Sequence, residues 1–556
     1  MRIVNFGVIG CVLAAALAMP TNGAVRKIKI TKRYLNFPVS HSTDRHVMTI
    51  AIKSHRCSSQ IRLAEAGADY WVFADMNAWR GKTATINYDG SEAALEKIVL
   101  SDTIFGTSEM YKERLRPQFH FTTRRGWIND PNGLVYLDGT WHLFYQHNPF
   151  ERNWGNMHWG HAVSADLVHW KELPDALHPD SLGTMFSGSA VYDKDNTSGF
   201  GEKGNAPLVF AYTADSPEAE RQCIAYSTDG GLTLTKYSAN PVVDSRQKWQ
   251  SHDTRDPKLL WYAPGKHWVM VLNERNGNSI YTSSNLKDWT YSSHITGFWE
   301  CPELFEIAVE GNPGERKWVM WGASGTYMVG DFDGKTFRPL TPKLQNVSGS
   351  GYAAQTFSNI PATDGRIIKM TWATINFDGM PFNGAMLMPQ EQVLSRSALG
   401  QWQLKSRPVK EMEQVFTCEA DESSLTVEEA NRILERFNSD ILRIKATLEL
   451  TYATDAGLAF HGQRLVDYNM NWNRINGQFY SPAEPGSMKL NVDVYVDRGM
   501  AEVFVDGGAY SYSLPIENKP AGGNGYLFWG NEMKVERLQV YSAKSIWQTG
   551  EASAEK

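Results

Sequence analysis

The sequence predicts an all-β protein: a five-bladed β-propeller followed by a C-terminal β-sandwich, with a small β-rich accessory domain in front. The first observation is a repeat. From about Gly126 to Ser406 an aromatic-rich strand leads through a short polar turn to a second aromatic-bearing strand, at a period of about 50 to 65 residues. The element S-x-D/N-L-x-x-W occurs twice in this region, at Ser164–Trp170 and Ser283–Trp289. Such a repeat of short strands and Gly, Asp or Asn turns is typical of propeller blades, of which about five can be counted. A sandwich with accidental internal similarity is the alternative.

The second observation is a change of pattern after Pro408. Apolar and polar residues alternate in "ILRIKATLELTY", "MKLNVDVYVDRG", "AEVFVDGGAYSYSL" and "MKVERLQVYSA". Alternation with a period of two, together with D-R-G and D-G-G turns, predicts a β-sandwich. We therefore assign residues 113–410 to the propeller, 415–547 to the sandwich and 548–556 to a frayed tail. Within the sandwich, Val427–Asn438 fits either a short helix or a strand edge.

The first 24 residues are typical of a cleaved secretory signal. Arg2 precedes an apolar stretch that runs from Ile3 to about Met19, and small residues follow. Lipid anchoring at Cys11 is the alternative, and it is less favoured because the apolar run continues past this residue. No other stretch approaches about 18 uncharged apolar residues, so no transmembrane span is expected. We expect an exported protein, located in a periplasm, on a cell surface or outside the cell.

Residues 25–112 precede the propeller and are too long for a linker. "HVMTIAIKS" and "YWVFADMNAWRGKTATINY" are typical of strands, and no catalytic motif occurs among them. We therefore predict a small β-rich accessory domain, to which the sequence assigns no role.

Composition narrows the function only slightly. The formal net charge of −6 gives no reason to expect nucleic acid or an anionic membrane as a partner. Aromatic residues make up 12% of the chain, which fits sugar binding but fits core packing of a large β-protein better. Beyond Cys11 the four cysteines are widely spaced without a C-x-x-C pair, so zinc is not expected, and a disulfide remains an open possibility.

Three acidic residues occur in stiff, polar turns at the starts of different repeats. They are Asp130 in "NDPN", Asp256 in "TRDPK" and Glu300 in "WECPEL". Pro131 and Pro257 follow the two aspartates, and a proline favours an extended backbone at the residue before it. One such acid alone would be read as a turn carboxylate that binds backbone N–H groups. Because the innermost strands of propeller blades line one channel, we expect the three acids to meet at the mouth of one funnel.

Such a cluster suits glycoside hydrolysis. One ionised carboxylate must attack the anomeric carbon, and a second, protonated carboxyl must release the leaving group and then act as base on water. Asp130, which follows the polar Asn129, suits the nucleophile, and Glu300 suits the acid/base. Arg255 adjoins Asp256 and is expected to keep it ionised, so that Asp256 binds substrate hydroxyls instead of exchanging protons.

No cofactor and no metal ion are expected, because this chemistry needs only carboxyl groups. His147, His158 and His161 lie near the acidic motifs in the sequence. No His/Cys cluster with metal-ligand spacing occurs around them, so we interpret them as hydrogen-bonding groups behind the site.

The motifs together resemble glycoside hydrolase family 32, the β-fructosidases that include levanases, inulinases and invertases. The resemblance extends from about Arg116 to Ala543, and "VDRGMAEVFVDGG" (Val496–Gly508) is similar to the sandwich signature of that family. The propeller motifs occur in the family's order: "WINDPNG" (Trp127–Gly133), "FYQHNP" (Phe144–Pro149), "WGNMHWGHAVSADLVHW" (Trp154–Trp170), "FSGSA" (Phe186–Ala190), "RDPK" (Arg255–Lys258) and "ECPELF" (Glu300–Phe305).

The resemblance implies a five-bladed propeller and a retaining mechanism through a covalent fructosyl-enzyme intermediate. It implies that Asp130 is the nucleophile, Glu300 the acid/base and Asp256 the stabiliser of the transition state. In a retaining glycosidase the two reacting carboxyl groups lie about 5–5.5 Å apart. The resemblance also implies a fructose subsite formed by Trp127, Asn129, Gln146, Trp154, Phe186, Ser187 and Arg255.

Two segments depart from the family pattern. Phe382, Asn383 and Gly384 stand where many invertase-like members have Trp-Arg-Gly, which resembles exported fructan-degrading members and weakens the expectation of a sucrose preference. The segment up to about Glu113 lies outside the family's usual domains and is similar to an accessory domain found ahead of some bacterial members.

Our first hypothesis is an exo-acting enzyme that releases terminal fructose from levan, inulin or sucrose. Endo-levanase or endo-inulinase activity is the runner-up, and fructosyl transfer to a sugar acceptor is a third option. A non-catalytic fructan-binding protein on the same scaffold would be expected to lack Asp130 or Glu300, and both are present. Adhesion through the two flanking β-domains, or a separate sugar site on the sandwich, are further alternatives.

Overall fold

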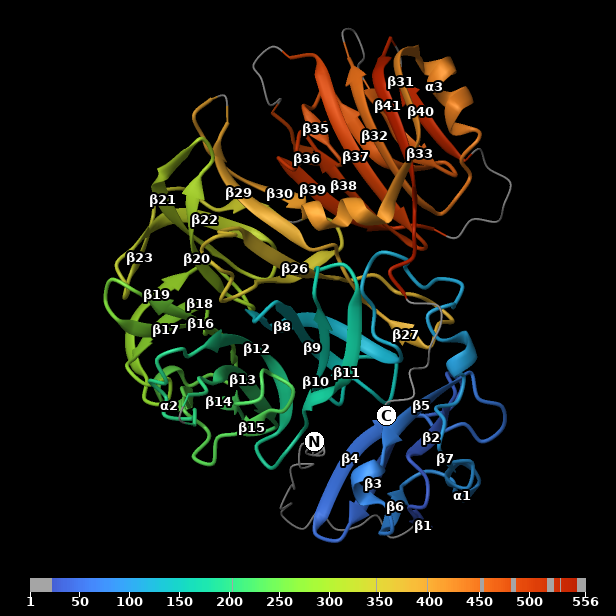
Figure 1. Ribbon diagram of the computed structural model, residues 1–556, viewed down its shortest axis with the longest axis vertical. Helices are drawn as coiled ribbons and strands as arrows, with labels where there is room; N and C mark the ends of the chain where they lie inside the picture. Colours follow the sequence, from blue (N-terminus) through green and yellow to red (C-terminus); the bar gives the residue numbers. More distant parts are fainter. Residues whose placement is uncertain are drawn as a thin grey trace.

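The computed structural model describes residues 23–202, 204–346, 348–397, 399–450, 455–481, 487–517, 525–530 and 532–547. Nearly all of the predicted secretory signal, with Cys11, and the predicted tail lie outside these ranges. The described chain is almost entirely β-structure, as predicted (Figure 1). A small β-domain, a ring of blades and a sandwich follow one another along the chain, in blue, cyan to yellow, and orange to red.

The N-terminal domain consists of two small sheets packed over one apolar core. Its buried side chains include Leu35, Phe37, Val72 and Ile86. A four-stranded sheet has the order β1-β6-β3-β4, so β4 is an edge strand, and a three-stranded sheet has the order β5-β2-β7. The elements are β1 (Ala24–Lys29), β2 (Tyr34–Val39), β3 (His46–Ile52), β4 (His55–Ile61), β5 (Tyr70–Asp75), η1 (Asn77–Trp79), β6 (Thr83–Tyr88), α1 (Glu92–Leu95), β7 (Val99–Ser101) and η2 (Thr107–Glu109).

The first three blades are antiparallel sheets, each with its strands in chain order. Blade one contains β8 (Gly126–Leu137), β9 (Thr140–Asn148), β10 (His158–Ser164) and β11 (Trp170–Leu177). Blade two contains β12 (Thr184–Tyr192), β13 (Leu208–Ser216), β14 (Ala219–Ser227) and β15 (Thr235–Lys236), and helix α2 (Arg246–Trp249) leads to blade three. Blade three contains β16 (Thr254–Tyr262), β17 (His267–Glu274), β18 (Gly277–Ser283) and β19 (Thr290–Thr296).

Blades four and five share one continuous sheet, because Val309 and Leu394 form a parallel bridge between them. Blade four contains β20 (Glu303–Val309), β21 (Asn312–Trp321), β22 (Thr326–Phe332), β23 (Phe337–Pro339) and β24 (Leu344–Gln345). Blade five contains β25 (Gly351–Thr356), β26 (Ile367–Ala373), β28 (Ala385–Met386), β29 (Gln390–Arg396) and β30 (Trp402–Pro408). The short strand β27 (Phe382–Asn383) pairs in parallel with the start of β8 and closes the ring.

The repeated S-x-D/N-L-x-x-W element forms the tight turn between the third and fourth strands of blades one and three. Asp166 accepts hydrogen bonds from Ser164 Oγ and from the backbone N–H groups of residues 168 and 169. Leu167 adopts a left-handed conformation with φ 65°, and Trp170 closes the turn by donating its indole N–H to the Leu167 carbonyl. The second copy, Ser283–Trp289, makes the equivalent bonds through its asparagine, leucine and tryptophan. The repeat therefore encodes an Asx-turn that the side chains stabilise.

The sandwich packs a six-stranded sheet against a five-stranded sheet, and both contribute to one apolar core. The first has the order β31-β41-β32-β37-β38-β39 and the second β36-β35-β34-β33-β40. Helix η3 (Lys410–Val415) leads from the propeller into the sandwich. The strands are β31 (Phe416–Thr426), β32 (Ile441–Glu449), β33 (Asp455–Phe460), β34 (Gln463–Asn469), β35 (Arg474–Ile475), β36 (Gln478–Phe479), β37 (Lys489–Asp497), β38 (Met500–Val505), β39 (Tyr510–Pro515), β40 (Tyr526–Gly530) and β41 (Lys534–Ala543).

The segment for which the sequence left helix and strand edge open contains a helix, α3 (Val427–Leu434). Thr426 and Glu429 form a capping box at its start, which fixes the first turn. Cys57, Cys223, Cys301 and Cys418 are all free thiols, so the possible disulfide does not form among the described cysteines. No helix in the described part of the chain is long and apolar enough to cross a membrane.

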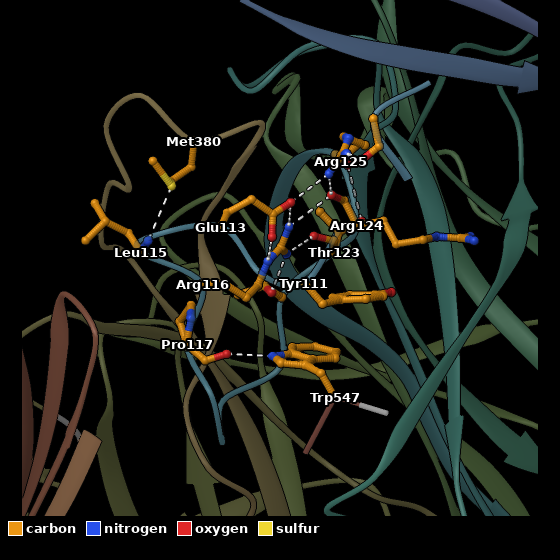
Figure 2. A network of polar contacts seen from close by, with 12 residues as sticks. Tyr111, Glu113, Leu115, Arg116, Pro117, Thr123, Arg124, Arg125, Met380 and Trp547 are labelled. Atoms are coloured by element: carbon orange, nitrogen blue, oxygen red, sulfur yellow. Dashed lines mark hydrogen bonds and ion pairs between the residues drawn. The ribbon is translucent and has the colours of Figure 1, made fainter. Parts of the chain in front are cut away.

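A polar network around Arg116 holds the entry to the propeller (Figure 2). The Arg116 side chain is fully buried and forms a two-point ion pair with Glu113. It also donates to Thr122 Oγ1 and to the carbonyl of Thr123, and its guanidinium lies 3.6 Å from the ring centroid of Phe382. Figure 2 shows this cluster beside Trp547, whose indole donates to the carbonyl of residue 117 at 2.6 Å. The entry segment therefore contacts both the ring closure and the end of the sandwich.

A second buried network joins the propeller to the sandwich. His120 contacts Asp497 through Nδ1 at 2.8 Å and Glu502 through Nε2 at 2.9 Å. Asp497 also accepts hydrogen bonds from the backbone N–H groups of residues 118 to 120. Glu502 accepts hydrogen bonds from the backbone N–H of Met388 and from the side-chain amide of Gln390. Both acids lie in the predicted sandwich signature. The two carboxylates and their hydrogen bonds raise the pKa of His120 to about 9 despite its burial.

This raised pKa predicts a pH-dependent stability. The unfolded imidazole has a pKa near 6.5, so the contribution of His120 is complete below about pH 6.5 and is lost as the pH rises through about 9. We expect His120→Gln to destabilise the protein more at about pH 6 than at about pH 10, by a difference on the order of 3 kcal/mol. Urea unfolding of both proteins at the two pH values measures this difference. Equal destabilisation at both would contradict a charged His120.

Candidate active site

Blades one, two, three and five, together with Glu300 in the segment that leads into blade four, line one cavity of about 380 Å³. The three predicted catalytic acids lie in its wall together with most of the predicted sugar-binding residues. The lining residues are Asn129, Asp130, Gln146, Trp154, Phe186, Ser187, Glu220, Arg255, Asp256, Glu300, Tyr352 and Trp372. The volume falls within the range of small-molecule sites in proteins.

Backbone bulges carry the site residues. The register between inner and second strand shifts between Ile128 and Pro131 in β8, between Met185 and Gly188 in β12, and between Arg255 and Lys258 in β16. These shifts span Asn129 and Asp130, Phe186 and Ser187, and Asp256, and a fourth shift in β25 follows Tyr352. A bulge adds a residue and re-aims the side chains beside it. The same irregularity in four of the five blades therefore turns their side chains toward one point.

Asp130 is surrounded by hydrogen-bond donors. Ser187 Oγ donates to Oδ2 at 2.7 Å, Asn129 Nδ2 donates to Oδ1 at 3.1 Å, and Cys301 Sγ lies 3.4 Å from Oδ2. Burial raises the pKa of Asp130, and the nearby Glu300 carboxylate acts in the same direction. The three donors oppose this shift because they bind the ionised form, which is the form a nucleophile needs.

Asp256 differs from the sequence-based expectation in two ways. Its φ is 65°, so it is left-handed and not extended as the following proline predicted. The bulge imposes this conformation, and the Asp256 N–H donates to Thr213 Oγ1 at 3.0 Å. Burial and the Asp130 carboxylate raise the pKa of Asp256 to about 7, so Arg255 does not keep it fully ionised. The Cys301 N–H donates to Asp256 Oδ2 at 2.9 Å and attaches it to the segment that carries Glu300, and the Cys301 sulfur lies 3.5 Å from the same oxygen.

Arg255 acts to lower the pKa of Asp256, but burial and the Asp130 carboxylate outweigh it, and its hydrogen bonds go to other acids. Its guanidinium binds Glu220 at 2.8 Å and Asp253 at 3.0 Å. It also lies 3.4 Å from Glu300 Oε1. Tyr352 makes the second contact with this carboxyl group by donating its hydroxyl to Oε2 at 2.6 Å. Glu300 is thus held by one cation and one hydroxyl, and its φ of 49° is a strained conformation of the kind that persists at functional sites.

Aromatic rings form the rest of the wall. Trp154 is 54% exposed and lies edge-to-face with Phe186, with ring centroids 6.0 Å apart. Trp372 also lines the cavity, and its buried indole N–H has no hydrogen-bond partner among the described residues. Trp127 was predicted to bind substrate, but it is not among the lining residues. It donates its indole N–H to Asn129 Oδ1 at 2.8 Å and packs edge-to-face on Trp372, so it supports the wall from behind.

The three histidines near the motifs make hydrogen bonds outside the cavity lining. His147 pairs with Asp175 at 2.7 Å, His158 contacts the carbonyl of Asn156, and His161 contacts His142. Within the described residues, no group of three or more His, Cys, Asp or Glu side chains is arranged to hold a metal ion.

Comparison with known proteins decides the family. A family model described as "Glycosyl hydrolases family 32 N-terminal domain" matches residues 120–406, about half of the chain. The chain belongs to glycosyl hydrolase family 32. The family assignment makes it a glycoside hydrolase, and it agrees with the resemblance that the motifs gave.

Relatives extend the similarity of this family 32 chain beyond the propeller. A levanase of Bacillus subtilis is 37% identical over 493 residues, covering 80% of this chain and 72% of its own. An extracellular exo-inulinase of Aspergillus niger is 32% identical over 521 residues, covering 79% of this chain and 96% of its own. The crystal structure of exo-inulinase from Aspergillus awamori superposes with a TM-score of 0.68 at 28% identity, covering 79% of this chain and 100% of its own.

Sequence reasoning missed four residues of the family 32 site: Glu220, Tyr352, Trp372 and Cys301. Glu220 and Trp372 lie on second strands or beyond, outside any turn motif, and they reach the cavity only because the blades converge. Tyr352 lies beside a bulge in β25, at the same level as the predicted residues of earlier blades. Cys301 adjoins Glu300, and its thiol lies between two carboxylates, which the sequence had no means to place.

Asp256 is buried close to the carboxylates of Asp130 and Glu300, so we predict that it lowers the stability of the protein while serving the active site. Because the native state keeps this proton up to about pH 7 and the unfolded chain loses it near pH 4, native stability falls as the pH rises through that window. We expect Asp256→Asn to remove the penalty and to raise the free energy of unfolding by up to roughly 4 kcal/mol at about pH 8, with less gain at about pH 5. Thermal unfolding at both pH values measures the gain.

Asp253→Asn is the matched control for this prediction. It removes a half-exposed carboxylate that binds the same arginine, outside the cavity. We expect no comparable stabilisation, because no buried charge is relieved. A destabilised Asp256→Asn at about pH 8 would contradict the account of crowding.

Proposed function

We propose that this chain is a retaining β-fructosidase that releases fructose from the ends of β-linked fructans such as levan and inulin, with sucrose as a further substrate. The observation that carries the proposal is the placement of Asp130, Asp256 and Glu300 around one compact cavity. Asp130 would be the nucleophile, Glu300 the acid/base, and Asp256 the residue that binds the hydroxyls of the fructosyl ring.

In the first step of the proposed reaction, Asp130 Oδ attacks the anomeric carbon of the bound fructosyl unit. The bond to the leaving oxygen breaks, and Glu300 gives its proton to that oxygen. Ser187 and Asn129 orient the attacking carboxylate, and Tyr352 and Arg255 hold the Glu300 carboxyl in position. The product of this step is a fructosyl ester of Asp130.

In the second step water replaces the leaving group. Glu300, now ionised, takes a proton from the water as its oxygen attacks the anomeric carbon, and Asp130 leaves as a carboxylate. Fructose departs with retained configuration and Glu300 regains its proton. A protonated Asp256 can donate a hydrogen bond to the ring hydroxyls, and an ionised one can accept, so both forms suit the binding role.

The compact cavity favours exo over endo cleavage. Trp154, Phe186 and Trp372 form its walls, and its volume suits a terminal sugar unit better than the middle of a chain. The names of the relatives support the substrate class, since they include levanase, exo-inulinase and an invertase of Saccharomyces cerevisiae. Endo-levanase or endo-inulinase activity remains the alternative on the same site.

Product analysis separates these two modes. With levan, inulin and sucrose as substrates, we expect fructose to be the only sugar that appears from the polymers at the earliest times. Chromatography of the initial products measures this. Oligosaccharides that precede fructose would establish endo cleavage, and release of no fructose from any of the three would contradict the enzymatic proposal.

The two reacting carboxyls have different expected signatures. We expect Asp130→Asn and Glu300→Gln each to lower kcat on inulin at least about 10³-fold, because nucleophilic and acid/base roles contribute roughly factors of this size. Fructosyl fluoride needs no protonation of its leaving group, so it should restore much of the glycosylation rate in Glu300→Gln but not in Asp130→Asn. If both variants respond alike to the fluoride, the two roles are assigned wrongly.

A further inference from the structure

The N-terminal domain binds a loop of blade one through a buried ion pair. This loop, residues 149–157, connects β9 to β10, and we call it the Trp154 loop. Glu151 Oε2 accepts Nε and Nη2 of Arg45 at 3.0 and 2.7 Å, and Nη1 of Arg62 at 3.0 Å. Only 1% of the Glu151 side chain is exposed. Since both cations belong to the N-terminal domain, the charge of this loop is compensated from outside the propeller.

A second attachment follows on the other side of Trp154. The Asn156 side chain binds the backbone of Gln60 on edge strand β4, accepting its N–H at 2.8 Å and donating to its carbonyl at 2.8 Å. Asn156 itself is left-handed, with φ 47°, which turns its amide toward the domain. The backbone N–H of Arg152 adds a bond to the hydroxyl of Tyr70 at 3.2 Å.

Trp154 lies between these attachment points and has little support of its own. It lines the cavity, is 54% exposed, and its ring contact is with Phe186. Inside the loop, Asn148 Nδ2 donates to the Asn153 carbonyl at 2.7 Å. The propeller also holds the loop, since Arg152 donates to the Phe377 carbonyl at 2.8 Å and Asn156 Nδ2 donates to Asn148 Oδ1 at 3.1 Å. The contacts on either side of the indole at Glu151 and Asn156 nevertheless come from the N-terminal domain, so its position depends in part on that domain.

We propose that the N-terminal domain is a positioning element of the active site, which fixes Trp154 as one wall of the sugar cavity by clamping the loop on both sides of it. The inference rests on the proposed function, since it takes the cavity to be the site of sugar binding. Arg45, Arg62 and Asn156 are positioning residues: they act on the substrate only through Trp154.

The chemistry of the clamp supports a dedicated role. A buried carboxylate is costly unless it is paired, and removal of its partners leaves an uncompensated charge that favours exposure of the loop to water. Glu151 is such a carboxylate, and the two arginines that pair with it, Arg45 and Arg62, both belong to the N-terminal domain. Loss of the clamp should therefore release the loop without disturbing Asp130, Asp256 or Glu300, whose contacts lie within the propeller.

Two variants of the full-length protein test the clamp. Arg45→Met with Arg62→Met removes both cations and leaves every contact of the loop with the propeller in place. Asn156→Gly removes both backbone bonds to Gln60, together with the 3.1 Å bond to Asn148 Oδ1, and tolerates the left-handed conformation. The control is Arg26→Met, which breaks the ion pair with Glu96 and the bonds to the carbonyls of Leu95 and Ile98, all inside the N-terminal domain. Strand β1, which carries Arg26, is at the opposite edge of the sheet from β4.

We expect hydrogen exchange of peptides covering residues 148–158 to accelerate in both clamp variants and to stay unchanged in the control. We expect KM for inulin to rise roughly tenfold while kcat changes less than about twofold, because a loosened wall weakens sugar binding and leaves the carboxyls in place. In a Trp154→Ala background the clamp substitutions should raise KM less than about twofold further, since residues that act through one another are not additive.

Three outcomes would overturn the inference: unchanged exchange in the loop, unchanged KM with folded clamp variants, or a KM effect that persists fully without Trp154. Failure of the proposed function is distinguishable, because the unaltered protein would then release no fructose. In that case the hydrogen-exchange comparison still reports whether the N-terminal domain holds the loop.

Discussion

Closure of the ring is the constraint on which the active site depends. The short strand β27 pairs Phe382 with Gly126 and Asn383 with Trp127, which brings blade five against the segment that leads into Asp130. The fit is tight: a Cβ on Gly126 would lie 2.1 Å from the carbonyl oxygen of Asn148, and a Cβ on Gly384 would lie 2.3 Å from that of Ile128. The residues that depart from the invertase-like pattern thus take part in the closure, and they set the distance between the first and last walls of the cavity.

Much of this architecture could be predicted because it is encoded locally. The S-x-D/N-L-x-x-W turn closes on itself through its own side chains, so its two copies marked a repeat, and the recurring pairs of aromatic-rich strands gave the number of blades. Asp130, Asp256 and Glu300 could be proposed because each occurs at the start of a repeat. The turns expected there proved to be bulges inside strands β8 and β16 for the two aspartates. The conformation and charge of Asp256 could not be predicted, because the bulge in β16 and the neighbouring Asp130 determine them. Substrate binding by Trp127 stays a prediction, and its hydrogen bond to Asn129 is a contact that adjacency to a catalytic motif could not indicate.

The junctions between the parts of the molecule share one design, in which a buried charge on one part is compensated by another part. His120 of the propeller is held between two carboxylates of the sandwich, and Glu151 of the propeller between two arginines of the N-terminal domain. Such pairs penalise separation, since each partner alone would be a buried, unpaired charge. The relative placement of the parts is therefore specified by charge as well as by apolar packing. The propeller lies between the other two domains (Figure 1), and these contact blade one or the segment that leads into it.

The bond between Asn156 and Gln60 has a consequence for the history of such proteins. Asn156 binds only the main chain of strand β4, so any residue except proline at position 60 offers the same donor and acceptor. Drift at position 60 would leave the attachment intact, whereas drift at position 156 would break it. Positions 60 and 156 would therefore not covary among related sequences, although they are in contact. The dependence of the loop on the N-terminal domain would be visible only as conservation of asparagine at position 156.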